Sequence, residues 1–295
     1  MSDISTAFKN DYRDNFLLLV QQIESKLMPG VMVDTEVSGE QTFIDQIGLI
    51  EFEQLVGRHQ ETKNTDPEHF RRRLVTKPFT AAPLIDKPDK LRTITDPSSS
   101  FSEGVRRGSN RLQDDTIIAA FTGDAFTEKD GSVAVPLPST QIIAKDFVEG
   151  GGAADSNLTV GKVREAKRIL DDNDVPEDDR FLALSPSGST SLLRNSEITS
   201  SDFVEVKALV EGRIPMWMGF TFLPVSTRLL KSGDIRSNIA WHRSGMVLGF
   251  LENPITRVDE LPTKNYSVQV YGRVDLGSTR LEEETVVEIL SDETK

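Results

Sequence analysis

Apolar residues at the start of the chain recur every three or four positions. This spacing predicts an amphipathic helix that ends at Pro29 and Gly30. A helix with a single apolar stripe needs a partner surface. The core of the same chain and a neighbouring subunit are both compatible with the pattern. The stripe consists of Ile4, Phe8, Tyr12, Phe16, Leu19, Ile23 and Leu27.

The next segment, residues 43–95, predicts a long hairpin. An apolar stretch at 49–56 and a second arm at 70–75 flank a polar tip at 58–67, which contains Thr, Asn, Asp and Pro. The hairpin has few apolar residues of its own, so it is not expected to be stable alone. Its contacts should therefore be mainly intermolecular. Deletion of residues 57–74 is expected to leave a folded subunit that lacks these contacts.

A long helix is predicted over residues 98–122. Asp96 suits the N-cap, Pro97 suits the first helical position, and Gly123 suits the end. Gly104 and Gly108 each cost about 1 kcal/mol in a helix interior, but they let another backbone approach closely. The apolar face consists of Phe101, Val105, Leu112 and Ala119, with Ile117, Ile118 and Phe121 broadening its end.

The middle of the chain alternates strands and helices around a glycine joint. Residues 134–147 predict a strand broken by two prolines, and residues 150–152, all glycine, predict a hinge between domains. Thr159 is expected to cap a helix that ends in the acidic turn at 171–176. A buried strand at 181–184 and a helix from 187 to 193 follow.

The C-terminal part of the chain reads mainly as strands. A hydrophobic block covers 214–230, and core strands are expected at 239–241 and 246–251. Residues 266–271 alternate strictly, with Tyr266, Val268 and Val270 on one face. A turn near Gly277 and Ser278 is expected to lead into the last strand at 285–290. Helices mixed with mostly antiparallel strands predict an α+β fold.

Composition excludes several classes of function. The chain has 295 residues, with 34 Lys and Arg against 47 Asp and Glu, so its net charge is −13. A protein that binds nucleic acid as its main role needs a dense basic surface, which this balance does not offer. No apolar stretch approaches the roughly 20 residues needed to span a membrane, and the polar N-terminus is unlike a signal peptide. A cytosolic compartment, or one derived from the cytosol, is therefore expected.

Few residue types that carry chemistry are present. The absence of cysteine removes disulfides, thiolate nucleophiles and Cys-containing metal sites, and the histidines are only His59, His69 and His242. The acidic run at 171–174 fails the calcium-loop pattern, because Pro176 stands where a glycine is required. No cofactor, metal site or catalytic residue is predicted.

Three further motifs are better explained by structure than by catalysis. Gly161 and Lys162 lack the upstream glycine and the following Ser or Thr of a P-loop. The serine cluster at 185–189 lacks the spacing of a nucleophile elbow, and helix capping explains it better. His242 lies in an apolar strand, where a packed or hydrogen-bonded histidine is more common than a catalytic base.

Three consecutive arginines lie on a predicted strand, so their side chains should alternate between its two faces. On a strand, Arg71 and Arg73 share a face and Arg72 points the opposite way. A solvated face and a contact with a neighbour's carboxylates explain this cluster about equally well.

Several sequence motifs of the chain also resemble those of a known family of self-assembling proteins. The matching stretches are Arg72-Arg73, residues 84–92 (LIDKPDKLR), Asp96-Pro97, residues 111–120 (RLQDDTIIAA), residues 158–166 (LTVGKVREA) and Met218-Gly219-Phe220. Together with the order of segments, they resemble the major capsid proteins of tailed bacteriophages with the Hong Kong 97-type (HK97-like) fold. Among these, they are most similar to a podovirus-like subgroup of coat proteins.

The resemblance implies a role for each segment. Residues 1–42 would be an N-terminal arm and 43–97 an extended loop lying over a neighbouring subunit. Residues 98–149 and 255–295 would form the peripheral domain, with the long helix as its spine, and 150–254 the axial domain. Contacts between subunits would involve the extended loop, with Arg58, Arg71, Arg72 and Arg73 as candidates.

The resemblance also implies an assembly. Hexamers and pentamers would form an icosahedral shell that encloses double-stranded DNA without sequence-specific binding, in virions assembled in the host bacterial cytoplasm. A portal protein is an expected partner. Because only about 42 residues precede the hairpin, a separate scaffolding protein is expected, and no inter-subunit Lys–Asn cross-link is predicted.

Three alternatives stay open at this point. An encapsulin-type nanocompartment would share the fold and hold cargo enzyme in place of DNA. An acidic cytosolic hydrolase would use His242 with a nearby serine. A monomeric binding module would have to explain the unsupported hairpin.

Overall fold

The computed structural model describes residues 21–35, 37–39, 41–50, 52, 54, 64, 66–85, 98–194, 216–225 and 228–295. The predicted N-terminal helix lies outside this part up to residue 20. Its last predicted turns, at 21–27, are not helical, and the chain next forms the 3₁₀ turn η2 (Met28–Gly30). We call residues 21–31 the strap, because they cross from the long helix to a neighbouring sheet.

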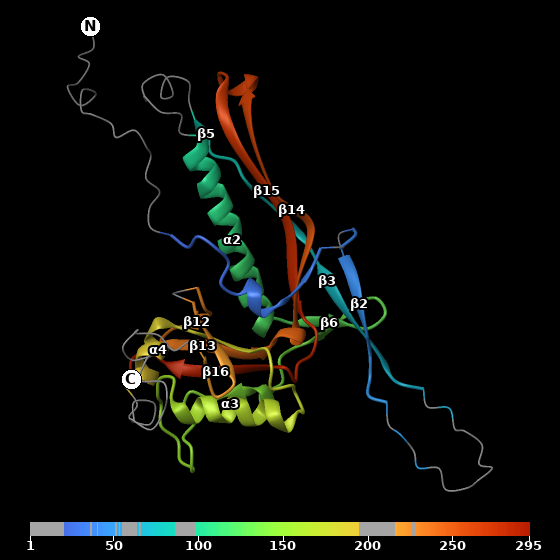
Figure 1. The fold of residues 1–295 in the computed structure, drawn as a ribbon, viewed down its shortest axis with the longest axis vertical. Coiled ribbons are helices and arrows are strands. Elements are labelled where there is room, and N and C mark those ends of the chain that lie inside the picture. The colour runs from blue at the N-terminus through green and yellow to red at the C-terminus, as the bar shows by residue number, and fades with distance from the viewer. Residues whose placement is uncertain are drawn as a thin grey trace.

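The long helix α2 (Ser98–Thr122) lies along a five-stranded sheet (Figure 1). The sheet follows the order β1 (Met32–Asp34), β14 (Met246–Leu261), β15 (Ser267–Arg280) and β4 (Lys77–Ala81), and β5 (Leu84–Ile85) also pairs with β15. Strands β14 and β15 form a long antiparallel hairpin closed by η5 (Pro262–Lys264). The predicted bounds of the helix are confirmed.

A seven-stranded mixed sheet forms a second layer at one end of α2 (Figure 1). Helices α3 (Val160–Asp172) and α4 (Pro186–Leu193) contribute to the core on one face of this sheet. The sheet runs β10 (Met216–Trp217), β11 (Phe220–Pro224), β9 (Arg180–Leu184), β13 (Ile235–His242), β16 (Val286–Asp292) and β8 (Ile142–Ile143), with β12 (Lys231–Ser232) on β13.

A second hydrophobic core joins the helix to this sheet. Trp241 and Ile239 of β13 pack with Ile117 and Phe121 near the end of α2, and Leu27 of the strap lies in the same cluster. Trp241 Nε1 also donates a hydrogen bond to the Gly30 carbonyl at 2.6 Å. Shared burial of this kind fixes the helix and the sheet relative to each other.

The predicted hairpin is present at its base. β2 (Gln41–Ile47) pairs with β3 (His69–Val75) in antiparallel register, from Gln41 opposite Val75 to Ile47 opposite His69. These strands continue into β6 (Ala125–Thr127) and β7 (Val133–Val135) to make a four-stranded sheet. The first arm therefore begins earlier than predicted. Most of the predicted polar tip lies outside the described residues.

Several local predictions are confirmed. Thr159 caps α3, its side chain accepting a hydrogen bond from the Lys162 amide at 3.3 Å. β9 coincides with the predicted buried strand, and α4 begins at Pro186, capped by Ser185. The three glycines at 150–152 all have positive φ and lie in an exposed loop between Phe147 and Ala153, and their role as a hinge between domains stays a prediction.

Other local predictions are wrong. The strand predicted at 134–147 is reduced to short pieces interrupted by η3 (Ser139–Gln141), because the prolines interrupt the ladder. No turn occurs at Gly277, which lies inside β15. A Cβ there would overlap the Val75 carbonyl, so this glycine permits a close backbone approach. Tyr266 precedes β15 with positive φ and is exposed, and Ala119 is exposed on α2. No described helix is long and apolar enough to cross a membrane.

Candidate subunit-contact surface

The hairpin β2–β3 carries the basic cluster predicted from the sequence. Arg71 and Arg73 lie on one face of β3 and are partly exposed, while Arg72 points the opposite way and is buried. This is the alternation expected of a strand. Arg58 lies outside the described residues.

Arg71 is engaged by its partner strand. Its guanidinium makes two hydrogen bonds with the Asp45 carboxylate, at 2.5 and 3.1 Å, and lies 5.3 Å from the centre of the Phe43 ring. Hydrogen bonding to this carboxylate raises the pKa of Arg71, and the same hydrogen bond lowers the pKa of Asp45. Both side chains remain accessible to a neighbouring molecule.

Arg73 packs within its own chain. Its guanidinium lies 4.5 Å from the centre of the Phe126 ring on β6, and Gly131 of the β6–β7 turn sits against its aliphatic stem. Gly131 has a φ of 60°, which favours glycine, and a Cβ there would also collide with this stem. Arg73 thereby fastens the turn to β3.

Arg72 anchors the hairpin to the C-terminal part of the chain. Its Nε donates to the Leu281 carbonyl at 2.8 Å, and its guanidinium pairs with Glu283. The neighbouring Leu74 is fully buried with Val247 and Leu281. Because deletion of residues 57–74 would remove both anchors, the sequence-based deletion extends too far into the core.

The arginines differ in their expected effect on stability. Arg72→Ala should lower the free energy of unfolding by about 3 kcal/mol, since it breaks a largely buried ion pair and leaves Glu283 with the more distant Arg280, at 3.6 Å, as its partner. Arg71→Ala is the matched control and should change stability little, because its ion pair is exposed. Urea unfolding monitored by circular dichroism measures both. Equal losses for the two variants would contradict the assignment of Arg72 as the anchor.

An exposed apolar row begins at the last residue of β2 and continues into the segment that follows it. Leu49 is 95% exposed, Phe52 is 99% exposed, and Ile50 and Ile47 are also mostly exposed. A soluble monomer seldom presents such residues consecutively on a projecting segment. The sequence predicts intermolecular contacts for the whole hairpin, without assigning them to these residues. These apolar residues could have been predicted as the contact surface from the sequence, because the hairpin has no core of its own in which to bury them.

The residues tested for catalysis have structural roles. His242 Nδ1 lies 2.7 Å from Ser244 Oγ and accepts from the Ser244 amide, which caps the 3₁₀ turn η4 (Arg243–Gly245). Burial lowers the pKa of His242, although Asp179 opposes this effect. Ser185 is buried and accepts from the Gly188 amide as the cap of α4. Within the described residues, no group of three His, Asp or Glu could hold a metal ion.

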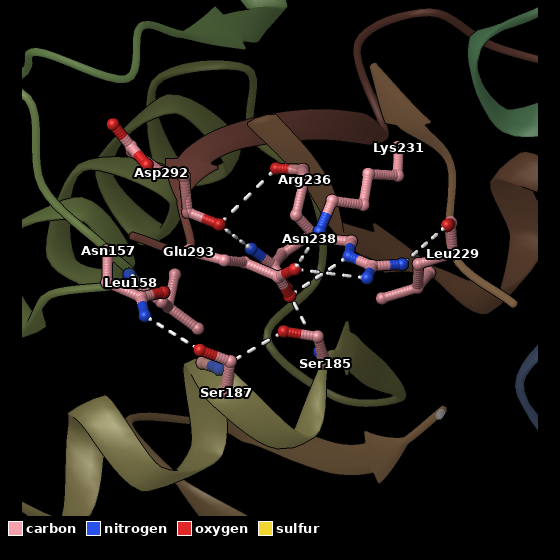
Figure 2. A network of polar contacts seen from close by, with 12 residues as sticks. Asn157, Leu158, Ser185, Ser187, Leu229, Lys231, Arg236, Asn238, Asp292 and Glu293 are labelled. Carbon is pink, nitrogen blue, oxygen red and sulfur yellow. Dashed lines mark hydrogen bonds and ion pairs between the residues drawn. The ribbon is translucent and has the colours of Figure 1, made fainter. Parts of the chain in front are cut away.

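A polar network joins the end of the C-terminal strand β16 to β13 and to the residue that caps α4 (Figure 2). Glu293 accepts from Lys231 at 2.8 Å and from two nitrogens of Arg236 at 3.1 Å, and Arg236 also donates to the Leu229 carbonyl. Asn238 accepts from the Ser185 amide and donates to Ser291. The network joins the β12–β13 hairpin, the cap of α4 and the end of the chain, which are distant from one another in sequence.

Glu293 makes this network sensitive to acid. Burial alone would raise the pKa of Glu293, but hydrogen bonds from Arg236, Lys231 and Ser185 outweigh it and lower the pKa from 4.5 to about 2. A depressed carboxyl pKa stabilises the native state above the unfolded pKa, and this contribution is lost as pH falls toward the native value. The free energy of unfolding of the wild-type protein should therefore exceed that of Glu293→Gln by less and less as the pH falls from 4.5 to about 2.

Urea unfolding at several pH values tests the role of Glu293. Glu177→Gln serves as the control, because the Glu177 side chain is 79% exposed. A stability difference between the native protein and Glu293→Gln that stays constant down to pH 2 would contradict the assignment.

Comparison with known proteins assigns the chain to a family. A family model described as phage capsid protein matches residues 4–293. A search of curated proteins found no match.

Solved phage capsids have similar folds at low sequence identity. The capsid of cyanophage P-SCSP1u is 17% identical, with a TM-score of 0.71 over 96% of this chain and 93% of that chain. The capsid of Ralstonia phage GP4 is 10% identical, with a TM-score of 0.75 over 99% and 98%. The head of Helicobacter pylori bacteriophage KHP40 is 10% identical, with a TM-score of 0.73 over 98% and 97%.

These likenesses confirm the α+β fold predicted from the sequence. The family match favours a phage capsid protein over the hydrolase, binding-module and nanocompartment alternatives. The chain belongs to the phage capsid protein family: it is a structural protein with the HK97-type fold, a major capsid protein that forms the phage head shell.

Proposed function

We propose that this chain assembles into hexameric and pentameric capsomers whose extended loops, residues 43–97, each lie over a neighbouring subunit. The observation that carries the proposal is the exposed apolar row at Ile47, Leu49, Ile50 and Phe52. The base of the same hairpin is anchored by Arg72 and Leu74. A rigid base with an uncovered apolar extension is suited to reach a second copy.

We also propose a division into domains, which the arrangement of the elements supports in part, since β8, β14 and β16 cross its boundaries. Residues 1–42 form the arm, 98–149 and 255–295 the peripheral domain, and 150–254 the axial domain. In support, α2 packs along the β14–β15 hairpin, and α3, α4 and β13 belong to the seven-stranded sheet and its core. Strand β16 of the last segment also pairs with β13, so the C-terminal strand completes the axial sheet.

The four arginines of the loop, Arg58, Arg71, Arg72 and Arg73, serve the contact between subunits in different ways in this proposal, since Arg72 is buried and can act on the contact only by holding the loop in place. Arg71 is accessible and pairs with Asp45, so both can exchange hydrogen bonds with a neighbour. Arg72 and Arg73 support the loop from within the chain.

The proposed shell encloses double-stranded DNA and is assembled with a separate scaffolding protein and a portal, as in podovirus-like phages. A net charge of −13 suits a container that holds DNA without binding it tightly.

Negative-stain electron microscopy tests this proposal. The protein is purified alone and after co-expression with its genomic neighbours. Closed shells, tubes or ring-shaped capsomers are the expected result, and DNA inside shells distinguishes a phage head from a nanocompartment with cargo enzyme. A monomer of 32.8 kDa under every condition would overturn the capsomer proposal.

A further inference from the structure

The outer edge of β14 is long and exposed. β15 pairs with one side of β14 as far as Leu261, but on the other side β1 is the only described strand that pairs with it, at 247–249. Residues 256–260 are all exposed, and Val258 is 48% exposed. The β14–β15 hairpin also projects past the start of α2 (Figure 1). A strand edge of this length is a template for pairing with another chain.

The backbone of β14 is oriented to use this edge. The Val270 amide of β15 donates to the Pro83 carbonyl at 3.0 Å, so it points away from β14. Val258 lies directly opposite Val270, and the two are therefore a non-hydrogen-bonded pair of the antiparallel ladder. The amide and carbonyl of Val258 consequently point toward the outer edge, where another strand can bond to them.

The charges beside Val258 do not protect this edge against a second copy of itself. Charged side chains commonly protect an exposed edge, most effectively where a second copy would place like charges opposite each other. Arg257 and Asp259 flank Val258 with opposite signs, and both are exposed. An antiparallel second copy therefore brings opposite charges together.

We propose that β14 pairs with β14 of a second copy in antiparallel register, centred on Val258. This register places the two Val258 residues opposite each other, and each Arg257 opposite the Asp259 of the second copy. Ile255 then lies opposite Leu261, and both are only partly buried in the single chain. Opposite charges and apolar side chains that face each other across two strands stabilise a sheet.

The neighbouring registers are unfavourable. Side chains that pair across two strands lie on the same face of the sheet, so a symmetric pairing of one strand with itself is centred on a residue. A centre at Arg257 would place the two arginines opposite each other, and a centre at Asp259 would do the same with the two aspartates. Like charges directly opposite destabilise a sheet. The edge therefore favours Val258 as the centre.

A contact of this kind joins two copies about a two-fold axis. Each copy contributes the same surface, so the contact closes on itself and cannot link successive subunits of a ring of five or six. It therefore connects one capsomer to the next, a conclusion that rests on the capsomers proposed above. The pairing of β14 does not depend on them, because the single subunit already presents this edge.

A cysteine at the centre of the contact tests the register, because the chain has no cysteine of its own. Val258→Cys should oxidise to an interchain disulfide, before or after assembly, which non-reducing electrophoresis detects as a covalent dimer. Thr256→Cys is the matched control, since Thr256 is exposed on the same face of β14. In the proposed register its two copies lie about 14 Å apart, beyond the roughly 7 Å that a disulfide bridges, so this variant should stay monomeric.

Charge reversal tests the pairing through the flanking residues. In the Val258→Cys protein, Arg257→Asp or Asp259→Arg alone makes both flanking pairs like-charged and should lower the yield of covalent dimer about tenfold. The two reversals together restore opposite charges and should restore the yield.

The outcomes separate this contact from the capsomer proposal. Capsomers or shells whose Val258→Cys subunits stay monomeric would overturn the β14 pairing and leave the capsomer proposal intact. Covalent dimers without capsomers would support the pairing and count against the capsomers. Equal dimer yields from Val258→Cys and Thr256→Cys, or a double reversal that behaves like the single ones, would overturn the proposed register.

Discussion

Replacing residues 50–66 by an Asn-Gly turn should give a subunit that folds but closes no shells. The Gly48 amide donates to the Glu68 carbonyl at 2.7 Å, so Leu49 and Pro67 leave the hairpin at adjacent points that a two-residue turn can join. Arg72, Leu74 and the paired β2–β3 strands all remain. The thermal midpoint should therefore change little, while electron microscopy should show only unassembled subunits or open rings.

A second variant separates apolar contact from loop length. Changing Leu49, Ile50 and Phe52 to serine keeps the full loop and removes the exposed apolar row, and it should also reduce shell formation strongly. Its matched control changes Gln60, Glu61 and Thr62 to serine in the same loop. Normal shells from the shortened variant would mean that the loop makes no essential contact between subunits. Loss of folding would mean that it belongs to the subunit core.

Local features of the fold could be predicted because they depend on neighbouring residues. The bounds of α2 follow from its apolar spacing and from Gly123, and the start of α3 follows from the Thr159 cap. The strand β9 follows from a short apolar run. In each case the determining interactions span only a few positions.

Features set by distant contacts could not be predicted in the same way. Gly277 was interpreted as a turn, but it is required because the backbone at Val75 crosses β15 there. The last turns of the N-terminal helix are replaced by the strap, since the Asp114 carboxylate binds backbone amides that a helix would use differently. Tertiary contacts outweigh local propensity at both positions.

The candidate contact surface was predictable in outline only. Strand alternation correctly separated Arg72 from Arg71 and Arg73, but it could not tell which face is buried. That depends on Leu281 and Glu283, more than 200 positions away in the sequence. The sequence therefore reveals the basic cluster, but only the structure shows the role of each arginine.

The strongest unpredicted feature is Lys162. Its motif with Gly161 was rejected as a phosphate loop, and the structure gives it another role. The side chain is fully buried, and Nζ donates to the carbonyls of Lys145, Ser156 and Leu290 at 2.7, 2.9 and 3.0 Å. Nζ also lies 3.3 Å from the Asn157 carbonyl. Lys162 therefore braces both ends of the glycine loop at 150–152 against β16.

Lys162→Met should lower the free energy of unfolding by about 2–4 kcal/mol at pH 7, because it leaves buried carbonyls without this donor. Lys167→Met on the same helix is the control and should have a small effect, since its ion pairs are partly exposed. Urea unfolding of both variants measures these losses. A small loss for Lys162→Met would show that the loop is held by its other contacts.

The effect of pH gives a second, independent test of Lys162. Burial lowers the pKa of Lys162 from 10.5 to about 8, with Asp146 and Asp155 opposing this effect. Between pH 8 and 10.5 the unfolded chain keeps a proton that the native protein has lost, so the contribution of Lys162 to native stability rises with pH. The difference in free energy of unfolding between the wild-type protein and Lys162→Met should therefore widen between pH 8 and 10.5. A difference that narrows would mean that the carbonyl cage favours the charged ammonium more strongly than burial disfavours it.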